Sequence, residues 1–422
     1  MAGTGSRGWR GTSRSYASIA AVSLGDVRLT VVGVGADGWS GLTEAVRDVI
    51  VAAEVVLGAP RQLDLLPAVA GQRRTAWPSP LRAGLEAVLI ECAGHRTVAL
   101  ASGDPMVSGI GSTLVEVLGP DRVSVVPHVS SVALARARLG WSAESAVVVS
   151  AVGRDVHAVL RELAPDRRVL VLSADDRTPA DLAALLTAHG YGASRMVVLG
   201  DLGAAHESRT ETTAAAFDGP SPRLNVVAVE AVGPLVAGWA SGLPDEAFEH
   251  DGQLTKRDLR AAALARLLPA PGQLLWDVGA GAGSIGIEWL RAHPACRAVA
   301  VEADAVRAER IGRNARALGV PALRVVHGSA PGALADLPAP DAIFVGGGAT
   351  RPGVLPACVA ALRPGGRLVV HGVTLETETL LAAAYGERGG ELTRIHVEHA
   401  APVGTFTGWT PSRAVTQWAW RA

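Results

Sequence analysis

The 422-residue sequence predicts an α/β protein made of two successive series of layers, each built on a sheet with parallel strands. Short β-branched runs alternate along the chain with helical stretches rich in alanine and leucine, which is the pattern of such layers. The apolar content of 49% is ample for the separate cores of two or three domains. A glycine-rich turn at residues 279–283 directly follows one apolar strand and marks a candidate ligand site.

The expected strands are short runs of β-branched and other apolar residues. Those of the first series lie at residues 29–35, 97–101, 123–126, 147–150, 169–172, 195–199 and 224–229. Those of the second series lie at residues 274–278, 297–301, 323–326, 342–345 and 367–370. The two series do not repeat one another, so they predict two different domains.

The domain boundaries follow from changes in composition. Residues 238–253 contain glycine, proline and acidic residues without a helix or strand period, which predicts a linker. We therefore expect a first domain at 27–237 and a second at 254–422. Residues 1–26 are rich in glycine, serine and arginine, and their apolar stretch at 17–22 is too short for a signal peptide. They are expected to be a disordered leader or a misassigned start.

Charge and cysteine content narrow the class of protein. A net charge of −1 gives the chain no general attraction to nucleic acid or to anionic membranes. The longest apolar candidate, at 226–243, is broken by Glu230 and by a proline, so no membrane span is expected. Neither a metal-binding spacing nor a disulfide framework is formed by the three cysteines, Cys92, Cys296 and Cys358. A reducing cytoplasm and no metal site are therefore expected.

The glycine-rich turn of the second series predicts a nucleotide-cofactor site. Gly279, Gly281 and Gly283 connect the strand at 274–278 to a helix. Glycine suits these positions because a tight turn needs backbone angles that a β-carbon forbids, and because the ligand must approach the main chain closely. Asp277, at the end of the strand, favours S-adenosylmethionine, whose sulfonium and amino groups are cationic, over a pyrophosphate, which it would repel.

Two other interpretations of this turn stay open. The spacing Gly281-x-Gly283-x-x-Gly286 also fits a dinucleotide fingerprint, with Glu302 about twenty residues on as the ribose partner, so a nicotinamide cofactor is an alternative. A glycine-rich turn with a purely structural role is the other.

The first series contains three glycine- or serine-rich turns, each directly after an expected strand. They lie at residues 33–38, 101–105 and 126–132. Each alone would be an ordinary turn. Together they describe the carboxyl edge of one sheet, which is where open α/β folds bind their ligands.

These three turns resemble those of the tetrapyrrole methylase family, which has a Gly-x-Gly turn, a Ser-Gly-Asp-Pro turn and a Pro-x-x-Ser-Ser turn. The resemblance implies a two-lobed domain with S-adenosylmethionine folded in the cleft between the lobes. By this resemblance the cofactor contacts are Gly35, Ala36, Gly103, Asp104, Val107, Ser131 and Val132. His128 stands where glycine is commoner in the family. It is a candidate to line the substrate cleft, with a hydrogen-bonded loop histidine as the alternative.

The second series resembles the Rossmann-like fold of S-adenosylmethionine methyltransferases, and more narrowly the corrin-pathway methyltransferases that decarboxylate and act on carbon 15. The narrower resemblance rests on five patches in order, at residues 242–248, 254–260, 279–283, 328–334 and 345–348. It implies cofactor contacts at Thr255, Gly279, Ala280, Gly281, Ala282, Gly283, Glu302, Ser329 and Ala330, beside Asp277. A glutamate suits the ribose because its carboxylate accepts from both hydroxyls. Serine at 329 departs from the family's frequent aspartate, which leaves a carboxylate contact to the adenine in doubt.

The sequence signals for catalytic residues in the second domain are weaker than those for its cofactor contacts. Lys256, Arg257 and Arg260 are either a clamp for substrate carboxylates, since 256 and 260 share a helix face, or a solvated helix start. Glu376 is a candidate to orient a ring nitrogen of the substrate, or else a helix-capping or surface acid.

The order of the two resemblances is that of the bifunctional methyltransferases of cobalamin biosynthesis. It implies that the first domain methylates carbon 5 of the macrocycle, and that the second removes carbon dioxide from the ring C acetate and methylates carbon 15. One S-adenosylmethionine per domain is expected. The bridging carbon of a reduced tetrapyrrole is itself nucleophilic, so the protein must chiefly align it with the sulfonium methyl and exclude water.

The expected partners are a polycarboxylate tetrapyrrole and further copies of the chain, without nucleic acid or membrane. Two other functions stay open. A nucleic-acid or protein methyltransferase would share the glycine turn, but would more often show a basic stripe or an Asn-Pro-Pro-Tyr-like motif, and 345–348 is neither. A nicotinamide-dependent reductase is the other alternative.

Overall fold

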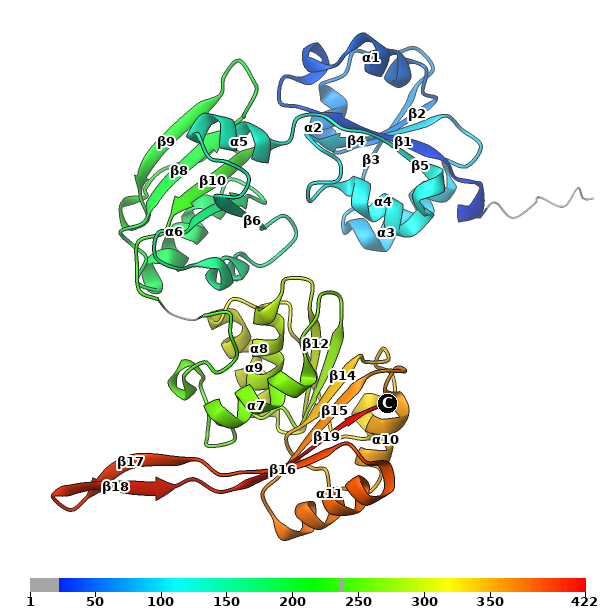
Figure 1. Cartoon of the computed structure of the whole chain (residues 1–422). Helices are drawn as coiled ribbons and strands as arrows, with labels where there is room; N and C mark the ends of the chain where they lie inside the picture. The colour runs from blue at the N-terminus through cyan, green and yellow to red at the C-terminus, as the bar shows by residue number, and fades with distance from the viewer. Residues whose placement is uncertain (1–22, 236–237) are drawn as a thin grey trace, which may run out of the picture. The chain divides into compact units, whose positions relative to one another are not determined.

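The computed structural model describes residues 23–235 and 238–422 (Figure 1). Contacts divide these residues into two units. One comprises the described chain up to Leu134 together with Gly203–His206, and the other comprises Ala135–Leu202 and the chain from Glu207 onward. The first 22 residues of the predicted leader lie outside the described part of the chain, whereas Leu24–Asp26 form a short 3-10 helix, η1.

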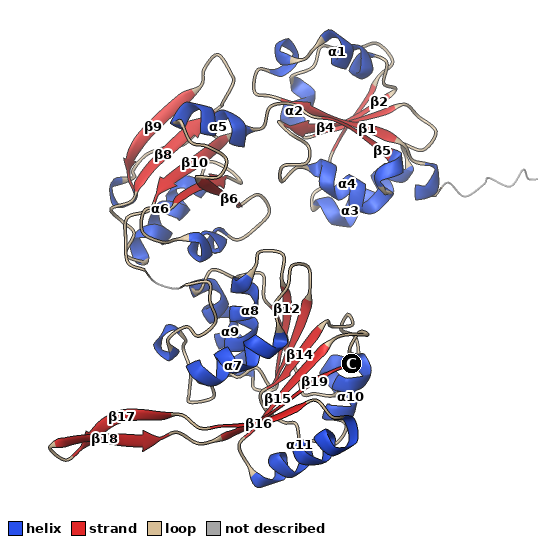
Figure 2. Ribbon diagram, viewed as in Figure 1, coloured by secondary structure: helices blue, strands red, loops and turns tan. Residues whose placement is uncertain are grey.

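The first unit is a parallel five-stranded sheet with helices on its two faces (Figure 2). In spatial order its strands are β3 (Arg73–Ala76), β2 (Val55–Gly58), β4 (Thr97–Ser102), β1 (Leu29–Val34) and β5 (Val123–Val126). Its helices are α1 (Glu44–Val51), α2 (Pro60–Asp64), α3 (Leu81–Ile90) and α4 (Ile110–Leu118), and α5 (Ser131–Leu139) continues into the second unit. Alternation along β1 sends Val31 to one apolar core and Val32 to the other, as the pleat requires.

Because every pairing in this sheet is parallel, the strands all end at one edge. The three turns singled out in the sequence follow β1, β4 and β5, which are neighbours in the sheet. The expectation of one carboxyl edge is therefore confirmed. The strands β2 and β3 were not among the expected strands; β3 reads Arg-Arg-Thr-Ala, which has no apolar run to signal a strand.

The second unit begins with a mixed sheet. Its spatial order is β6 (Ala146–Ser150), β7 (Arg168–Leu172), β10 (Asn225–Glu230), β8 (Arg195–Gly200) and β9 (Ser208–Thr213), and α6 (Thr178–Ala188) packs on it. Only the β6–β7 pairing is parallel. The expected parallel pairing is found here only between β6 and β7, because β10 inserts between β7 and β8 in the opposite direction. The polar edge strand β9 was missed for lack of apolar residues.

The C-terminal sheet has seven strands. Their order is β13 (Arg324–His327), β12 (Arg297–Glu302), β11 (Leu274–Val278), β14 (Ala342–Val345), β15 (Arg367–Gly372), β19 (Val415–Arg421) and β16 (Glu391–Ile395). The first five are parallel and match the expected strands. The strands β19 and β16 were missed, and β19 runs antiparallel to both of its neighbours, β15 and β16. One face is covered by α7 (Arg257–Leu267), α8 (Ser284–Ala292) and α9 (Ala305–Ala317), and the other by α10 (Val354–Ala361) and α11 (Leu375–Arg388).

Between β16 and β19 the chain forms a hairpin of β17 (Glu398–Val403) and β18 (Phe406–Pro411), which extends away from the C-terminal sheet (Figure 2). Phe406 is 79% exposed and Trp409 is 71% exposed. The remaining short 3-10 helices are η2 (Gly38–Gly41), η3 (Pro120–Arg122), η4 (Val156–Glu162), η5 (Ala214–Ala216), η6 (Asp245–Ala247) and η7 (Gly332–Leu334). No helix in the described residues is long and apolar enough to cross a membrane.

Part of the stretch predicted as a linker is packed on the C-terminal domain. The backbone amides of Gly242 and Leu243 donate to the two carboxylate oxygens of Glu288 on α8, at 2.6 and 2.9 Å. The side chains of Leu243 and Phe248 are buried in the core beneath α7 and α8. The packed part of this stretch therefore begins at Gly242.

Candidate functional site

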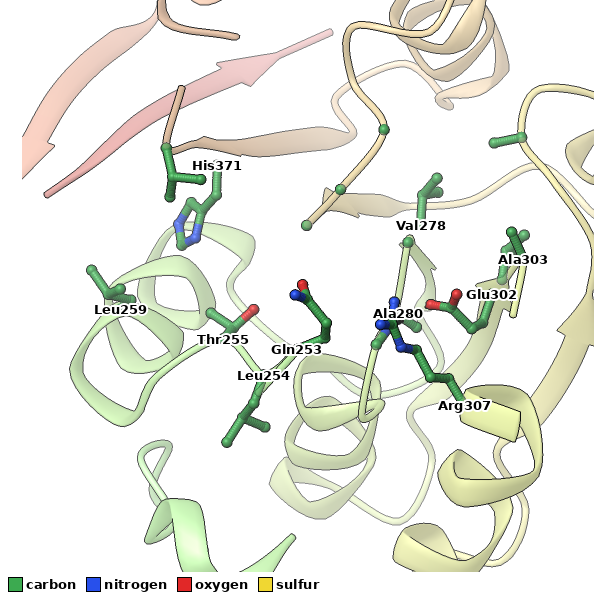
Figure 3. Close-up of a pocket in the computed structure, with 18 of the residues that line it drawn as sticks. Gln253, Leu254, Thr255, Leu259, Val278, Ala280, Glu302, Ala303, Arg307 and His371 are labelled. Carbon is green, nitrogen blue, oxygen red and sulfur yellow. Dashed lines mark hydrogen bonds between the residues drawn. The ribbon is translucent and has the colours of Figure 1, made fainter. Parts of the chain in front are cut away.

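A cavity of about 650 Å³ lies in the C-terminal domain at the carboxyl ends of β11, β12, β14 and β15 (Figure 3). Its wall comes from the segment 252–256 before α7, the glycine loop after β11, the end of β12, the loop after β14 and the end of β15. The strand order places β12 on one side of β11 and places β14 and β15 on the other. The cavity therefore has two ends on opposite sides of β11.

The glycine loop forms the floor between the two ends. Gly279 and Gly281 line the cavity with positive φ of +68° and +58°. A Cβ on Gly279 would lie 2.7 Å from the carbonyl oxygen of Gly347, and one on Gly281 would lie 2.6 Å from that of Gln253. Glycine is therefore required at both positions by conformation and by space.

The rest of the predicted loop contacts divide into two groups. Ala280 lines the cavity, whereas Ala282 and Gly283 lie behind the loop and do not. Gly283 caps α8 with φ of +77°, and a Cβ there would lie 2.7 Å from the Ile311 side chain. The packing of the start of α8 against Ile311 therefore explains why residue 283 is glycine.

Glu302 lies at the β12 end of the cavity. It ends β12, is 6% exposed and lines the cavity wall (Figure 3). Its Oε2 accepts from the Gly281 N–H at 2.8 Å, and its Oε1 accepts from the Asp304 N–H at 3.0 Å. These two bonds orient the carboxylate and leave its remaining lone pairs for a ligand.

Asp277 is placed differently from the expectation. It is fully buried, lies outside the cavity wall, and its Oδ2 accepts from the Gly286 N–H in the first turn of α8 at 2.9 Å. Burial raises the pKa of Asp277 to about 7. The structure gives it the role of anchoring the start of α8 in place of the expected direct contact with a cationic cofactor.

The loop after β13 contributes Gly328 and Ala330 to the wall beside Glu302. Ser329 does not line the cavity, and its hydroxyl accepts from the Arg351 guanidinium at 3.2 Å. Of the two predicted adenine neighbours, the structure therefore places Ala330 at the cavity and turns Ser329 toward an arginine.

The predicted carboxylate clamp is only partly present. Thr255 and Lys256 line the cavity, and Lys256 Nζ lies 3.5 Å from Asp245. Arg260 is completely buried, and its guanidinium donates to the carboxylates of Glu288 and Asp245. The hypothesis that Arg260 binds substrate carboxylates is wrong, because its charge is already neutralised inside the domain.

Arg257 and Glu376 also lie outside the cavity wall. Glu376 is exposed in the first turn of α11, where its own backbone N–H and the Thr374 hydroxyl hold the pKa of its carboxyl below the usual range. The structure supports the helix-capping alternative for Glu376 and does not bring it to the cavity.

The end of the cavity beyond β14 holds residues that sequence reasoning missed. Beside Leu259 and Val373, the wall contains His371, Ser412, Arg413 and Val415. His371 ends a correctly predicted strand, so the rule that ligands bind at the carboxyl ends of strands could have found it. Arg413 and its neighbours belong to the unpredicted β18–β19 connection and carried no such signal.

In the first unit the three turns are in close contact. A Cβ on Gly33 would lie 2.0 Å from the Gly103 carbonyl oxygen and 2.7 Å from the His128 backbone nitrogen. A Cβ on Gly35 would lie 2.9 Å from the His128 ring. The structure therefore brings Gly35, Gly103 and His128 together, and the His128 Nδ1 is buried with no partner in the described part of the chain.

The other predicted contacts of this unit follow the same edge. Ala36 lies in the turn after β1, Asp104 accepts from the Met106 N–H at 2.8 Å, and Val107 is 37% exposed. Ser131 begins α5, and the Val132 side chain beside it is buried. Asp104 thus stabilises its own turn.

Comparison with known proteins identifies relatives of both halves. The profile described as tetrapyrrole (corrin/porphyrin) methylases matches residues 28–218, and the one described as a precorrin methyltransferase domain matches residues 246–422. Over 396 residues the chain is 45% identical to the precorrin-6Y C(5,15)-methyltransferase (decarboxylating) of Sinorhizobium sp, covering 93% of this chain and 96% of that protein.

Two shorter relatives each match about two fifths of the chain. The probable cobalt-precorrin-6B C(15)-methyltransferase (decarboxylating) of Pyrobaculum calidifontis is 39% identical over 174 residues, which cover 39% of this chain and 88% of that protein. The cobalt-precorrin-7 C(5)-methyltransferase of Salmonella typhimurium is 35% identical over 176 residues, which cover 41% of this chain and 84% of that protein.

Proposed function

Because the chain belongs to the precorrin-6Y C(5,15)-methyltransferase (decarboxylating) family, we propose that its two domains divide the two methylations between them. The protein is an S-adenosylmethionine-dependent methyltransferase of cobalamin biosynthesis, and it decarboxylates its substrate. The domain at 27–237 methylates carbon 5, and the domain at 254–422 removes carbon dioxide and methylates carbon 15. Relatives named for the single activities support this division, since each is about the size of one domain.

In the C-terminal domain the cofactor lies at the Glu302 end of the cavity. The oriented carboxylate of Glu302 accepts from the ribose hydroxyls, and Gly279, Ala280 and Gly281 allow the cofactor to approach the main chain. Ala330 borders the adenine. The single observation that carries this proposal is that Glu302 and the glycine loop line one cavity and are hydrogen-bonded to each other.

The macrocycle occupies the other end, over β14, β15 and β19. A cofactor held by β12 can direct its methyl group across β11 toward that end, since β11 and β14 are adjacent. Cations surround this space: Lys256, Arg351 and Arg413 all line the cavity. Arg413 has no ion pair within the described residues, so its charge is available to a carboxylate of the polyanionic substrate.

A second S-adenosylmethionine binds the first domain at the carboxyl edge of β1, β4 and β5. The supporting observation is the contact among the turns that contain Gly35, Gly103 and His128. Ala36, Asp104, Val107, Ser131 and Val132 lie on the same turns or directly after them. His128 lines the substrate side of this site.

Product analysis of the intact chain tests the proposal. With methyl-labelled S-adenosylmethionine and precorrin-6Y, the wild type should add two labelled methyl groups and release one molecule of carbon dioxide. Gly281→Val should abolish labelling at carbon 15, because the branched side chain would meet the Gln253 carbonyl. Gly312→Ala is the matched control, since a Cβ there meets nothing. Labelling at carbon 15 by a folded Gly281→Val chain would contradict the division.

A further inference from the structure

His371 contributes an imidazole ring to the wall of the C-terminal cavity. It is the last residue but one of β15, is 9% exposed and contributes to the cavity wall on the side of β11 opposite Glu302 (Figure 3). On the proposed function, which this inference presupposes, that side receives the macrocycle. The ring therefore faces the part of the substrate where carbon 15 and the ring C acetate react.

Two neighbours fix the orientation of the ring. The His371 Nε2 lies 2.9 Å from the Gln417 Oε1 on β19, and the ring meets Phe344 edge-on with centroids 5.0 Å apart. An amide oxygen can only accept, so Nε2 carries the proton and Nδ1 of the neutral ring keeps its lone pair. Within the described residues Nδ1 has no hydrogen-bond partner, and it is not enclosed by the protein. It is therefore open to the cavity.

The imidazole is also neutral before substrate binds. Burial lowers the pKa of His371 to about 4, so the ring is neutral at ordinary pH and its Nδ1 lone pair is free to accept a proton.

The other ionisable groups of the wall are poorly suited to proton transfer at this end. Glu302 lies on the far side of β11 and is engaged with two backbone amides. Lys256 is paired with Asp245, and Arg307 with Asp251. The remaining arginines of the wall, Arg351 and Arg413, offer only donor groups and no lone pair for a proton.

The chemistry requires one proton to move between two carbons. When carbon 15 attacks the sulfonium methyl, the carbon–sulfur bond breaks toward sulfur, and carbon 15 then loses its proton. When the acetate loses carbon dioxide, its electron pair enters the ring imine, and the remaining methylene takes up a proton to become a methyl group. The proton released at one carbon equals the proton consumed at the other, so a single base can serve both steps.

We propose that His371 is a catalytic residue of the C-terminal domain: its Nδ1 accepts the proton from carbon 15 and delivers it to the methylene left by decarboxylation. Gln417 is the positioning residue that holds the ring in the required tautomer. General acid–base groups of this kind contribute about 10²–10⁴ to the rate.

The test uses the full chain with precorrin-6Y and labelled S-adenosylmethionine. His371→Asn should lower kcat for carbon dioxide release and for carbon 15 methylation at least 100-fold, with the cofactor affinity of both domains within about twofold of the wild type. His399→Asn is the matched control, because His399 is exposed on β17 and outside the cavity wall.

Gln417→Met tests the same inference without altering the imidazole. The Gln417 Nε2 is buried without a partner in the described chain, so a methionine of similar shape removes an unpaired donor. This gain offsets the loss of the acceptor for the His371 Nε2, and the fold should tolerate the change. It should lower kcat about tenfold with KM unchanged. Wild-type rates in a folded His371→Asn chain would overturn this inference and leave the proposed function standing. If His371→Asn does not fold, wild-type rates in Gln417→Met would do the same. Absence of carbon 15 methylation by the wild type overturns the proposed function and this inference with it.

Discussion

The carboxylate of Glu302 accepts a hydrogen bond from the backbone amide of Gly281 at 2.8 Å, which ties the end of β12 to the glycine loop after β11. The same carboxylate accepts from the Asp304 amide through its other oxygen. Because the loop and the acid are joined within the protein, a cofactor bound as we propose would meet a site whose polar groups are already in place. Pre-orientation of this kind lowers the ordering cost of binding.

Replacing Glu302 by alanine should weaken S-adenosylmethionine binding to the C-terminal domain by about 1–3 kcal/mol, because the ribose hydroxyls and the Gly281 amide both lose a charged acceptor. Isothermal titration of the intact chain can resolve this site from the other. Glu309→Ala is the control, since Glu309 is exposed on α9 and outside the cavity wall. Unchanged affinity in Glu302→Ala would show that the cofactor does not use this acid.

Arg260→Met should destabilise the C-terminal domain by about 3–5 kcal/mol, because it leaves the buried Glu288 carboxylate without its cationic partner. Urea unfolding measured by circular dichroism gives the value. Arg257→Ala, one turn earlier and exposed, should change the unfolding free energy by less than about 0.5 kcal/mol. A loss below 1 kcal/mol for Arg260→Met would mean that Glu288 is adequately satisfied by the backbone amides alone.

The stability of the domain should fall as the pH rises through the range in which Asp277 titrates. Burial raises its pKa to about 7, whereas the unfolded chain loses the same proton near pH 4. Between these values only the unfolded state is ionised, so the unfolding free energy should drop by a few kcal/mol from about pH 4 to pH 7.

Asp277→Asn should remove this part of the pH dependence while keeping an oxygen for the Gly286 amide. The variant should therefore be more stable than the wild type at pH 8, and the advantage should shrink at pH 5. Urea titrations at both values measure it, with the exposed Asp336→Asn as control. Parallel pH profiles for the wild type and Asp277→Asn would refute the assignment.

A fragment comprising residues 240–422 should fold alone, because it keeps Leu243, Phe248 and the two amides that bind Glu288. A fragment starting at 254 lacks all of these, and removing two buried apolar side chains alone costs about 2–5 kcal/mol each. Thermal unfolding of the two fragments compares them directly. Equal midpoints would show that 242–248 adds nothing to the domain.

The hairpin of β17 and β18 predicts self-association of the chain. Residues 400–411 contain no charged residue, and Phe406 and Trp409 are largely exposed, whereas solitary edge strands usually carry charges that prevent pairing. A second copy of the chain would cover this surface. Light scattering should give the wild type a mass above that of one chain, and Phe406→Ser with Trp409→Ser should lower it. Val306→Ser, which alters an exposed apolar residue on α9, should not.

Much of the C-terminal architecture could be predicted from the sequence, because strands that are buried on both faces appear in it as continuous apolar runs. The sequence also located Gly281 and Glu302, which the structure joins through one hydrogen bond. The prediction that Arg260 binds substrate carboxylates was wrong because a helix start in the sequence gives no sign of a buried acid such as Glu288, 28 residues away. The strands β16 to β18 were missed because their exposed faces interrupt any apolar period. The buried strand β19 was missed because Thr416 and Gln417 interrupt its apolar residues.

The last strand of the chain lies inside its sheet, between β15 and β16, and supplies the partner of His371. While the polypeptide is still emerging from the ribosome, β15 therefore has a bare edge and the cavity lacks one wall. The cavity is therefore complete only when β19 has been inserted between β15 and β16. A nascent chain that stalls before Val415 leaves this wall open and exposes the edge of β15 to a neighbouring strand.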